Sequence, residues 1–465
     1  MNPTAELIQP EVQELVREGR FSELRAALRG LPSADLADVV MALEPDEAAI
    51  LFRFLPRDDA GEVFAYLPQE KQEELIGQLG ASAVRVIEGM DVDDRARLLD
   101  ELPTEVAQRL IGSLNPEERR QTQAILGYPA ESVGRLMTPD YVRIRREWTV
   151  AEAMAHVRRY GRDAETINVV YVVGEAGELV GEVRLRQLLL AEPSAFVESV
   201  MDRNVVALRA DQDQEEAVRQ LTRYDRVALP VLDTRGSLLG IVTHDDVADV
   251  AQEEATEDIH RIGGLEALDQ PYMETGLGEM YRKRGFWLSA LFVGQGVTIL
   301  ALKAFEDTID RAAVLAVFLP LVISCGGNSG SQAATLVTRA VALGEVGMGD
   351  GWRILRHELA TSALLAASLG ALGLASVLVF NGLVFPALGW EVTGHPVRLA
   401  VAVALAIAGV VLWGTMVGSL LPLVLKRFGF DPATASSPLV ATLMDASGTV
   451  LYLAMALAIL RGTLL

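Results

Sequence analysis

The chain has 465 residues, with 41 lysines and arginines, 63 aspartates and glutamates, and one cysteine. A net charge of −22 argues against a nucleic-acid-binding protein, which needs a basic surface, and a single cysteine excludes a disulfide scaffold or a thiolate metal cluster. The charge is unevenly distributed: the first 281 residues carry a net charge of −25 and the remainder carry +3. The sequence therefore joins an acidic, soluble part to a nearly neutral, apolar part.

Residues 1–130 are predicted to form an all-α domain of short repeats. Helix-start residues recur about every twelve positions, at Pro32, Pro45, Pro56, Pro68, Gly80, Asp91, Pro103 and Pro116. Proline suits the first helical turn because the N–H that it lacks has no partner there. One short helix cannot bury its apolar stripe alone, so we expect the units to stack as a superhelix. A plain helical bundle is the alternative.

Residues 131–255 contain an internal duplication. Met137 lies at the start of the first copy and Met201 at the start of the second, 64 residues later. Each copy then offers a short strand, a helix, an apolar strand, a turn with glycine and a further strand. This order resembles a tandem pair of cystathionine-β-synthase (CBS) domains, which are α/β domains.

The CBS resemblance implies a candidate nucleotide position. In that family a Thr-x-x-Asp segment binds the ribose of an adenine nucleotide, and Thr243 and Asp246 match it in the second copy. The first copy has Arg184 and Gln187 instead, which limits the pair to one such site, for example for ATP. A purely structural repeat is the alternative.

Residues 256–284 are predicted to form a helix that connects the soluble part to the apolar part. Acidic residues are dense from the end of the second copy onward: Asp245, Asp246, Asp249, Glu253, Glu254, Glu257, Asp258, Glu266, Asp269, Glu274 and Glu279. Glu254, Glu257 and Asp258 have the spacing of one helix face, where like charges repel. A solvated face is the alternative to a cation-binding one.

Residues 285–465 are predicted to form a transmembrane domain of five helices. Apolar runs of the length needed to cross a bilayer lie at about 286–304, 312–342, 359–385, 397–425 and 436–460. Short loops rich in lysine and arginine, at 282–284, 353–356 and 426–427, place the N-terminus in the cytoplasm and the C-terminus outside. The N-terminus has no apolar segment typical of a cleaved signal peptide.

Two polar features lie within these runs. The segment 325–332 contains Gly327, Asn328 and Gln332, and we expect either irregular backbone beside a wet cavity or close helix packing. Asp445 is a carboxylate within the fifth run, which makes it a candidate functional site. The basic residues of these runs, Lys303, Arg339 and Arg398, lie near the ends of the runs, so none is expected to pair with it. Oxygen ligands without a cluster of histidine or cysteine favour a hard cation such as Mg²⁺, Ca²⁺ or Mn²⁺.

Together these features resemble the MgtE family of magnesium channels over almost the whole chain. The Gly-Gly-Asn-x-Gly-x-Gln segment at 326–332 and the segment from Pro438 to Asp445 carry the resemblance. It implies a homodimer in the cell (inner) membrane, with a pore lined by the second and fifth spans. Asp445 would hold hydrated Mg²⁺, together with the Ala441 carbonyl, and the connecting helix would act as a plug.

The resemblance also implies cytoplasmic carboxylates that sense Mg²⁺ and close the pore. They correspond to Glu62, Asp93, Glu215, Asp225, Asp246, Asp249, Glu254, Glu257, Asp258 and Asp431. One further acid of the N-terminal cluster is replaced by Arg97. Cations that bridge several domains would favour the closed state, and a full switch requires about 5.5 kcal/mol, which several ions can supply.

Two other functions remain alternatives. An ion-coupled secondary transporter of divalent cations would couple Mg²⁺ to Na⁺ or H⁺, and the lack of further acids in the spans disfavours it. A membrane sensor would bind nucleotide without conducting. An enzyme is not expected, because the sequence offers neither a nucleophile–base pair nor a phosphate-binding glycine loop.

Overall fold

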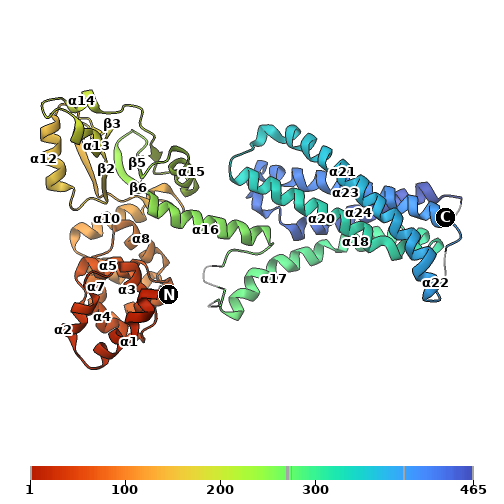
Figure 1. Cartoon of the computed structure of the whole chain (residues 1–465), viewed down its shortest axis with the longest axis horizontal. Helices are drawn as coiled ribbons and strands as arrows, with labels where there is room; N and C mark the ends of the chain where they lie inside the picture. The colour runs from red at the N-terminus through yellow and green to blue at the C-terminus, as the bar shows by residue number, and fades with distance from the viewer. Residues whose placement is uncertain (1–2, 269–271, 274, 391–392, 463–465) are drawn as a thin grey trace. The chain divides into compact units, whose positions relative to one another are not determined.

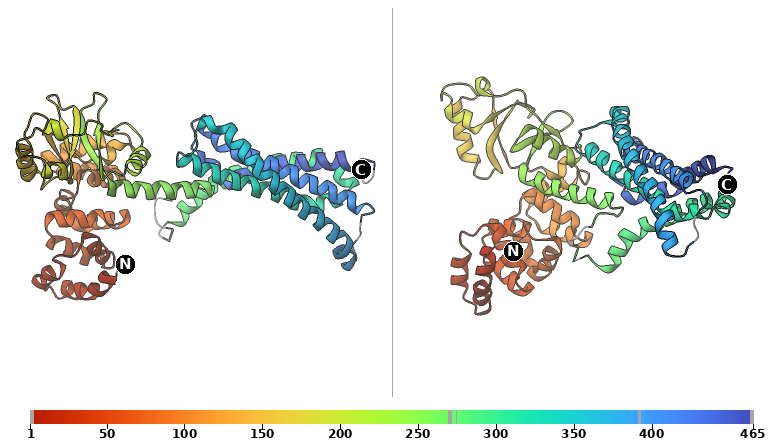
Figure 2. Two further views of the ribbon diagram at one scale, coloured as in Figure 1. Left: turned by 45° about the horizontal axis from the view of Figure 1, so that its top comes forward. Right: turned by 45° about the vertical axis from the view of Figure 1, so that its right-hand side comes forward.

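A computed structural model describes residues 3–268, 272–273, 275–390 and 393–462 of the protein (Figures 1 and 2). The chain divides into two compact units, Met1–Gln252 and Glu253–Leu465. Two acids of the predicted connector, Asp269 and Glu274, lie outside the described residues.

The first unit begins with a run of short helices, drawn in red to orange in Figure 1. They are α1 (Pro3–Arg17), α2 (Phe21–Leu28), α3 (Ser33–Met41), α4 (Pro45–Phe54), α5 (Arg57–Ala65), α6 (Gln69–Leu79), α7 (Ala83–Ile87), α8 (Val92–Glu101), α9 (Thr104–Ser113) and α10 (Pro116–Leu126). Helices two positions apart pack on each other, as α1 does on α3, α3 on α5, and α4 on α6. Their apolar stripes form one continuous core, and the expected all-α superhelical domain is confirmed.

The predicted helix starts are correct with one exception. Pro45 and Pro116 occupy the first position of their helices, and Asp91 directly precedes α8, as other prolines precede α3, α5, α6 and α9. Gly80 instead ends α6 with a φ of +53° and begins a 3₁₀ turn, η1 (Gly80–Ser82). A positive φ stops a helix and favours glycine, so this residue marks an end as well as a beginning.

The duplicated region forms two small sheets with the same topology. The first contains β1 (Tyr141–Arg145), β2 (Thr166–Val173) and β3 (Leu179–Arg184), and the second contains β4 (Leu208–Arg209), β5 (Ala228–Leu232) and β6 (Leu238–Thr243). In each sheet the first two strands are parallel and the last two antiparallel. The helices of this region are α11 (Val133–Leu136), α12 (Val150–Tyr160), α13 (Leu185–Leu190), α14 (Val197–Val200) and α15 (Gln214–Tyr224). The tandem α/β prediction is confirmed.

The two copies are joined by a buried core and by one ion pair. Tyr171 of β2 and Ile241 of β6 belong to the same fully buried cluster. Glu182 of β3 accepts a hydrogen bond of 2.6 Å from Arg226, and both side chains are largely buried. A buried ion pair costs desolvation but fixes a register, so it favours one arrangement of the two copies.

The predicted connecting helix at 256–284 is divided in the structure. Helix α16 (His244–Ile262) follows β6 directly, and α17 (Leu277–Gly294) begins the first membrane segment. Gly264 has a φ of +75°, and a Cβ there would lie 2.8 Å from the Trp287 indole nitrogen. Glycine is therefore required where the chain turns away from α16 and passes close to α17.

The second unit is a bundle of long apolar helices together with several short ones. They are α17, α18 (Gly296–Ala304), α19 (Glu306–Arg311), α20 (Val314–Ala342), α21 (Gly351–Val379), α22 (Phe385–Ala387), α23 (Pro396–Arg427) and α24 (Ser437–Leu460), with the 3₁₀ turns Met348–Asp350 and Pro432–Thr434 and a π-helical stretch Phe380–Val384. Among the described residues, five segments have the length and apolar composition of membrane spans: Leu277–Ala304, Val314–Ala342, Met348–Ala387, Pro396–Arg427 and Ser437–Leu460. The protein is therefore a membrane protein with the predicted spans.

Helix α20 is unbroken through the glycine-rich segment, so the expectation of irregular backbone there is wrong. Close packing explains the glycines instead. A Cβ on Gly414 of α23 would lie 2.4 Å from the Gly326 carbonyl oxygen, and one on Gly418 would lie 2.0 Å from that of Gly330. Small residues at every fourth position on both helices let the two backbones meet. Ser329 and Thr415 share a hydrogen bond of 2.8 Å in the same contact.

Candidate cation sites

Asp445 lies in the middle of α24 and is held by a side chain from the first span. The Gln295 amide nitrogen donates a hydrogen bond of 2.5 Å to its Oδ2 atom. Gln295 separates α17 from α18. Within the described residues no basic side chain forms an ion pair with Asp445, which is half-buried. The carboxylate is therefore oriented by a neutral donor, and its charge is left for another partner.

The other predicted pore residues fall on two different sides of their helices. Gly327 is buried, and a Cβ on it would lie 3.9 Å from the Cα atom of Ala441. Ala441 lies one turn before Asp445, and its carbonyl is within a continuous helix, so one lone pair is occupied. Asn328 and Gln332 lie one turn apart on an exposed face of α20. Both amide side chains are exposed in the single chain.

Asp431 is neutralised by an arginine that sequence reasoning missed. Arg261, near the end of α16, forms ion pairs with both Glu257 and Asp431. Asp431 also caps the 3₁₀ turn before α24 by accepting from the Ala433 N–H at 2.8 Å. The i, i+4 spacing of Glu257 and Arg261 was a visible signal, whereas the second partner is 170 residues away. Two of the predicted sensing acids, Glu257 and Asp431, are thus paired with the same arginine side chain.

A second acidic group forms where α8 meets the start of α16. Asp93 is 9% exposed, and its Oδ1 atom has no hydrogen-bond partner in the described structure. Burial and the charge of Asp246 raise the pKa of Asp93 well above its usual range. Burial likewise raises the pKa of Asp246 and that of Asp91. Carboxylates that face each other out of water repel, and a shared cation or proton relieves that repulsion.

Three acids around this group were not predicted from the sequence. Burial raises the pKa of Asp94 to about 6, against the opposing charge of Arg97. Burial, together with the charges of Asp91 and Asp246, raises the pKa of Glu165 to about 7. Asp140 likewise has a raised pKa, with burial as the main cause. Glu165 and Asp140 precede strands of the first CBS copy, so only the folded structure brings them to the group.

The remaining predicted acids are less closely gathered. Glu62 on α5 acts on the same region, since its charge contributes to the raised pKa of Tyr66 and of Asp91. Asp249 is exposed on α16. Glu215 and Asp225 lie at opposite ends of α15 and do not meet. Within the described residues, no three acidic, histidine or cysteine side chains converge into a ready-made metal site.

Two further predicted residues have partners within the chain. Arg97 lies 3.5 Å from Asp94 in an ion pair along α8, so it offsets one acid of the group. Thr243 donates a hydrogen bond of 2.6 Å to Asp246. Since Asp246 also faces Asp93, a ribose and the acidic group would compete for the same carboxylate. In the α16 segment, burial and Glu254 raise the pKa of Asp258.

Known structures resemble the first half of the chain. The crystal structure of the cytosolic domain of the Mg²⁺ channel MgtE in complex with ATP is 37% identical, with a TM-score of 0.50, and the match covers 52% of this chain and 99% of that one. The soluble part of a magnesium transporter matches with a TM-score of 0.52 and 26% identity over 54% of this chain and 99% of the other.

Sequence relatives extend the match to the full length. The magnesium transporter MgtE of Thermus thermophilus is 37% identical over 98% of this chain and 99% of its own, and that of Bacillus subtilis is 31% identical over 96% of both. Family profiles for the MgtE intracellular N domain, the CBS domain and the MgtE divalent cation transporter match residues 31–131, 133–194 with 197–253, and 319–455. The function that these names describe is non-enzymatic. The chain belongs to the MgtE family of magnesium transporters.

Proposed function

We propose that this protein is a Mg²⁺-selective channel that admits Mg²⁺ to the cell and closes when cytosolic Mg²⁺ binds between its soluble domains. The observation that carries the proposal is Asp445, a carboxylate in a membrane span that is oriented by Gln295 and has no basic partner in the described structure. A charged side chain at that depth is costly, so it is typical of a functional site. Attraction of a cation is the simplest function for an unpaired carboxylate there.

The ligand chemistry favours a hydrated ion. Mg²⁺ loses its water reluctantly and is often held through one or two carboxylates with several waters retained. The second carboxylate oxygen of Asp445, which Gln295 does not bind, is available as a ligand. The Ala441 carbonyl adds a weaker acceptor one turn away. Such a site fits the hydrated ion better than a fully stripped one, and the relatives named as magnesium transporters support the choice of Mg²⁺.

A homodimer would place the exposed polar face of α20 at a pore. Asn328 and Gln332 lie on that face, and polar side chains are poorly solvated by lipid. A second copy facing it would complete a wet path and supply a second Asp445. The soluble half would lie in the cytoplasm and the C-terminus outside, an orientation that the basic loops support.

Closure would use the acids of the soluble half. Asp93 and Asp246 come from different domains of the first unit, and so does the pair Asp94 and Glu165. A divalent cation binds more tightly when such groups are close together than when they are apart. This difference in affinity shifts the equilibrium toward the closed state. The acids Glu215, Asp225, Asp249, Glu254, Glu257, Asp258 and Asp431 would act in the same way where a moving domain brings them together.

ATP would bind at the second CBS copy through Thr243 and Asp246. The related cytosolic domain that contains ATP supports this assignment. Because Asp246 also faces Asp93, ATP would change the acidic group and hence the Mg²⁺ dependence of closure.

Flux measurements with the purified full chain in liposomes test the conduction proposal. We expect Asp445→Asn to abolish Mg²⁺ influx while Asp310→Asn, an exposed acid of the same unit, leaves it unchanged. Single-channel currents under a Mg²⁺ gradient support a channel. Slow flux that depends on Na⁺ or H⁺ would instead establish the alternative, an ion-coupled secondary transporter.

A further inference from the structure

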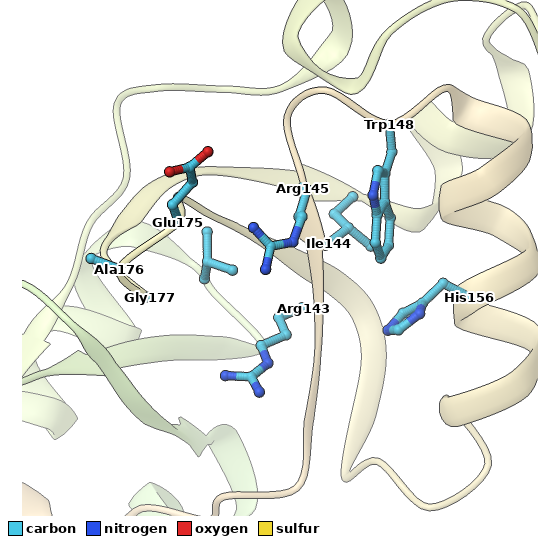
Figure 3. A pocket seen from close by; sticks show the side chains of 10 residues that line it. Arg143, Ile144, Arg145, Trp148, His156, Glu175, Ala176 and Gly177 are labelled. Carbon is cyan, nitrogen blue, oxygen red and sulfur yellow. The ribbon is translucent and has the colours of Figure 1, made fainter.

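The first CBS copy contains a cavity that the proposed transport function does not use. It has a volume of about 440 Å³ and is lined by Arg143 and Arg145 of β1, by Trp148 and His156, and by the turn at 173–177 (Figure 3). This volume lies within the range of pockets that hold small organic ligands.

The cavity lies on the first sheet, away from Arg184, which is the first-copy counterpart of Thr243. Arg145 pairs with Val173 at the carboxyl ends of the parallel strands β1 and β2. Arg184, the first-copy counterpart of Thr243, pairs with Val169 near the other end of β2. We therefore do not expect a ligand in this cavity to contact Arg184 or the Thr243–Asp246 position.

The internal duplication supplies a matched comparison. At a spacing of 64 residues, Arg145 corresponds to Arg209, which forms two hydrogen bonds of 2.9 and 2.8 Å with Asp211. The counterpart of Asp211 in the first copy is Glu147, which pairs with Arg146 at 2.7 Å instead. One copy thus neutralises its arginine internally, and the other directs it to the cavity.

Three further cavity residues of the first copy are also replaced in the second copy by residues that lack their charge or aromatic ring. Ala207 stands where the first copy has Arg143, while Gln212 and Gln220 stand where it has Trp148 and His156. The second copy therefore has neither the second guanidinium nor the aromatic wall. Cavity residues that differ in this way between two copies of a repeat are not explained by the fold that both copies share.

The two arginines favour an anion with several oxygen atoms. Their guanidinium groups lie on the same side of the cavity (Figure 3), and within the described residues neither forms an ion pair. Two like charges in one cavity repel, and a phosphate that accepts from both relieves the repulsion. Glu175 lines the same cavity, so its net charge stays positive, which is unusual in a half that carries −25.

The opposite wall suits a planar ring. The rings of Trp148 and His156 lie 5.0 Å apart, and those of His156 and Tyr160 lie 4.5 Å apart. Burial and the neighbouring arginines lower the pKa of His156, so this wall is neutral at physiological pH. Aromatic side chains of this kind stack on nucleobases and similar rings.

We propose that this cavity binds a small phosphorylated ligand with a planar ring, of the mononucleotide class, with its phosphate on Arg143 and Arg145 and its ring against Trp148. The site is separate from the transport path and from the Thr243–Asp246 position, so its existence does not depend on the proposed channel function.

Titration of the full-length protein in detergent with AMP tests the proposal, with the fluorescence of Trp148 as the readout. The other four tryptophans lie in the membrane unit, and subtracting the signal of Trp148→Phe isolates the cavity. We expect saturable quenching by AMP. The double variant Arg143→Ala/Arg145→Ala should need about tenfold more AMP or lose the effect, since charge-assisted contacts to phosphate dominate binding.

Three controls decide the outcome. Arg158→Ala/Arg203→Ala removes the same charge elsewhere on the domain pair, and Thr243→Ala alters the other nucleotide position; both should leave quenching intact. Inorganic phosphate should compete only at much higher concentration than AMP. The proposal is overturned if AMP fails to quench Trp148, if the two cavity arginines are dispensable, or if Thr243→Ala alone abolishes the signal.

Discussion

At the scale of single residues, long-range contacts decide which candidate acids carry an available charge. Gln295 and Asp445 are 150 residues apart in sequence, yet the amide is hydrogen-bonded to the carboxylate. A hydrogen bond to a charged group contributes about 1.5–3 kcal/mol. We expect Gln295→Leu to lower Mg²⁺ influx about tenfold at subsaturating Mg²⁺, because the carboxylate loses its orientation. Liposome flux measures this, and Ser289→Ala on α17, in the same span, is the control. Equal influx in both variants would show that Gln295 has no positioning role.

Arg261 has the opposite effect on Glu257 and Asp431, because it neutralises them. Its side chain is 39% exposed, so each pair is partly screened and contributes about 0.5–1 kcal/mol. We expect Arg261→Ala to lower the Mg²⁺ concentration that closes the protein by about two- to fivefold, because the two acids then attract a divalent ion more strongly. Inhibition of influx by Mg²⁺ added to the soluble side measures the shift. Arg282→Ala, an exposed arginine of α17, should cause none, and a rise in the closing concentration would contradict the prediction.

At the scale of elements, the contact between α20 and α23 depends on glycine at both surfaces. A Cβ on Gly418 would overlap the Gly330 carbonyl oxygen at 2.0 Å, and backbone cannot move aside as a flexible side chain can. We expect Gly418→Ala to destabilise the protein by about 1–3 kcal/mol, as overpacking does elsewhere. Thermal unfolding in detergent measures it. Gly278→Ala, where a Cβ meets nothing within 4 Å, should be neutral or slightly stabilising. A Gly418→Ala protein as stable as the unchanged chain would rule out the close contact.

The elements also show where sequence reasoning succeeds and where it ends. Proline positions and apolar runs are local signals, so the helix starts of the first domain and the five spans follow from them. The continuous helix α20 could not be predicted in this way. Its glycines are equally typical of a weakened helix and of a packing surface, and only the contact with α23 decides between the two. The end of α16 at Ile262 was missed because the acidic pattern continues past it. Partners such as Gln295 and Arg261 are set by tertiary folding alone.

At the scale of the whole molecule, the excess negative charge lies in the soluble half, where cation sensing is proposed. The soluble half carries −25, and several acids whose pKa is raised by burial gather where α8 meets α16, whereas the buried Glu182 is paired with Arg226 between the CBS copies. In the proposed channel, one carboxylate of the membrane half would suffice on the path, because a hydrated ion is stabilised by its own waters. In the proposed function, selection of the ion and sensing of the ion would rest on separate acids, and a change in one should leave the other intact.

Asp93 provides the sharpest test of that separation. Replacing it by asparagine removes a buried carboxylate that faces Asp246 and has an oxygen without a hydrogen-bond partner in the described structure. We expect Asp93→Asn to raise the unfolding temperature of the full chain in EDTA, because the repulsion is gone, and to shrink the further rise on adding Mg²⁺, because the ion loses a ligand. Influx at low Mg²⁺ should be unchanged, since Asp445 is untouched. Glu105→Gln on α9, an exposed acid outside the group, should leave both temperatures as they were. An undiminished Mg²⁺ shift in Asp93→Asn would remove this group from the sensor and direct attention to the acids of α16.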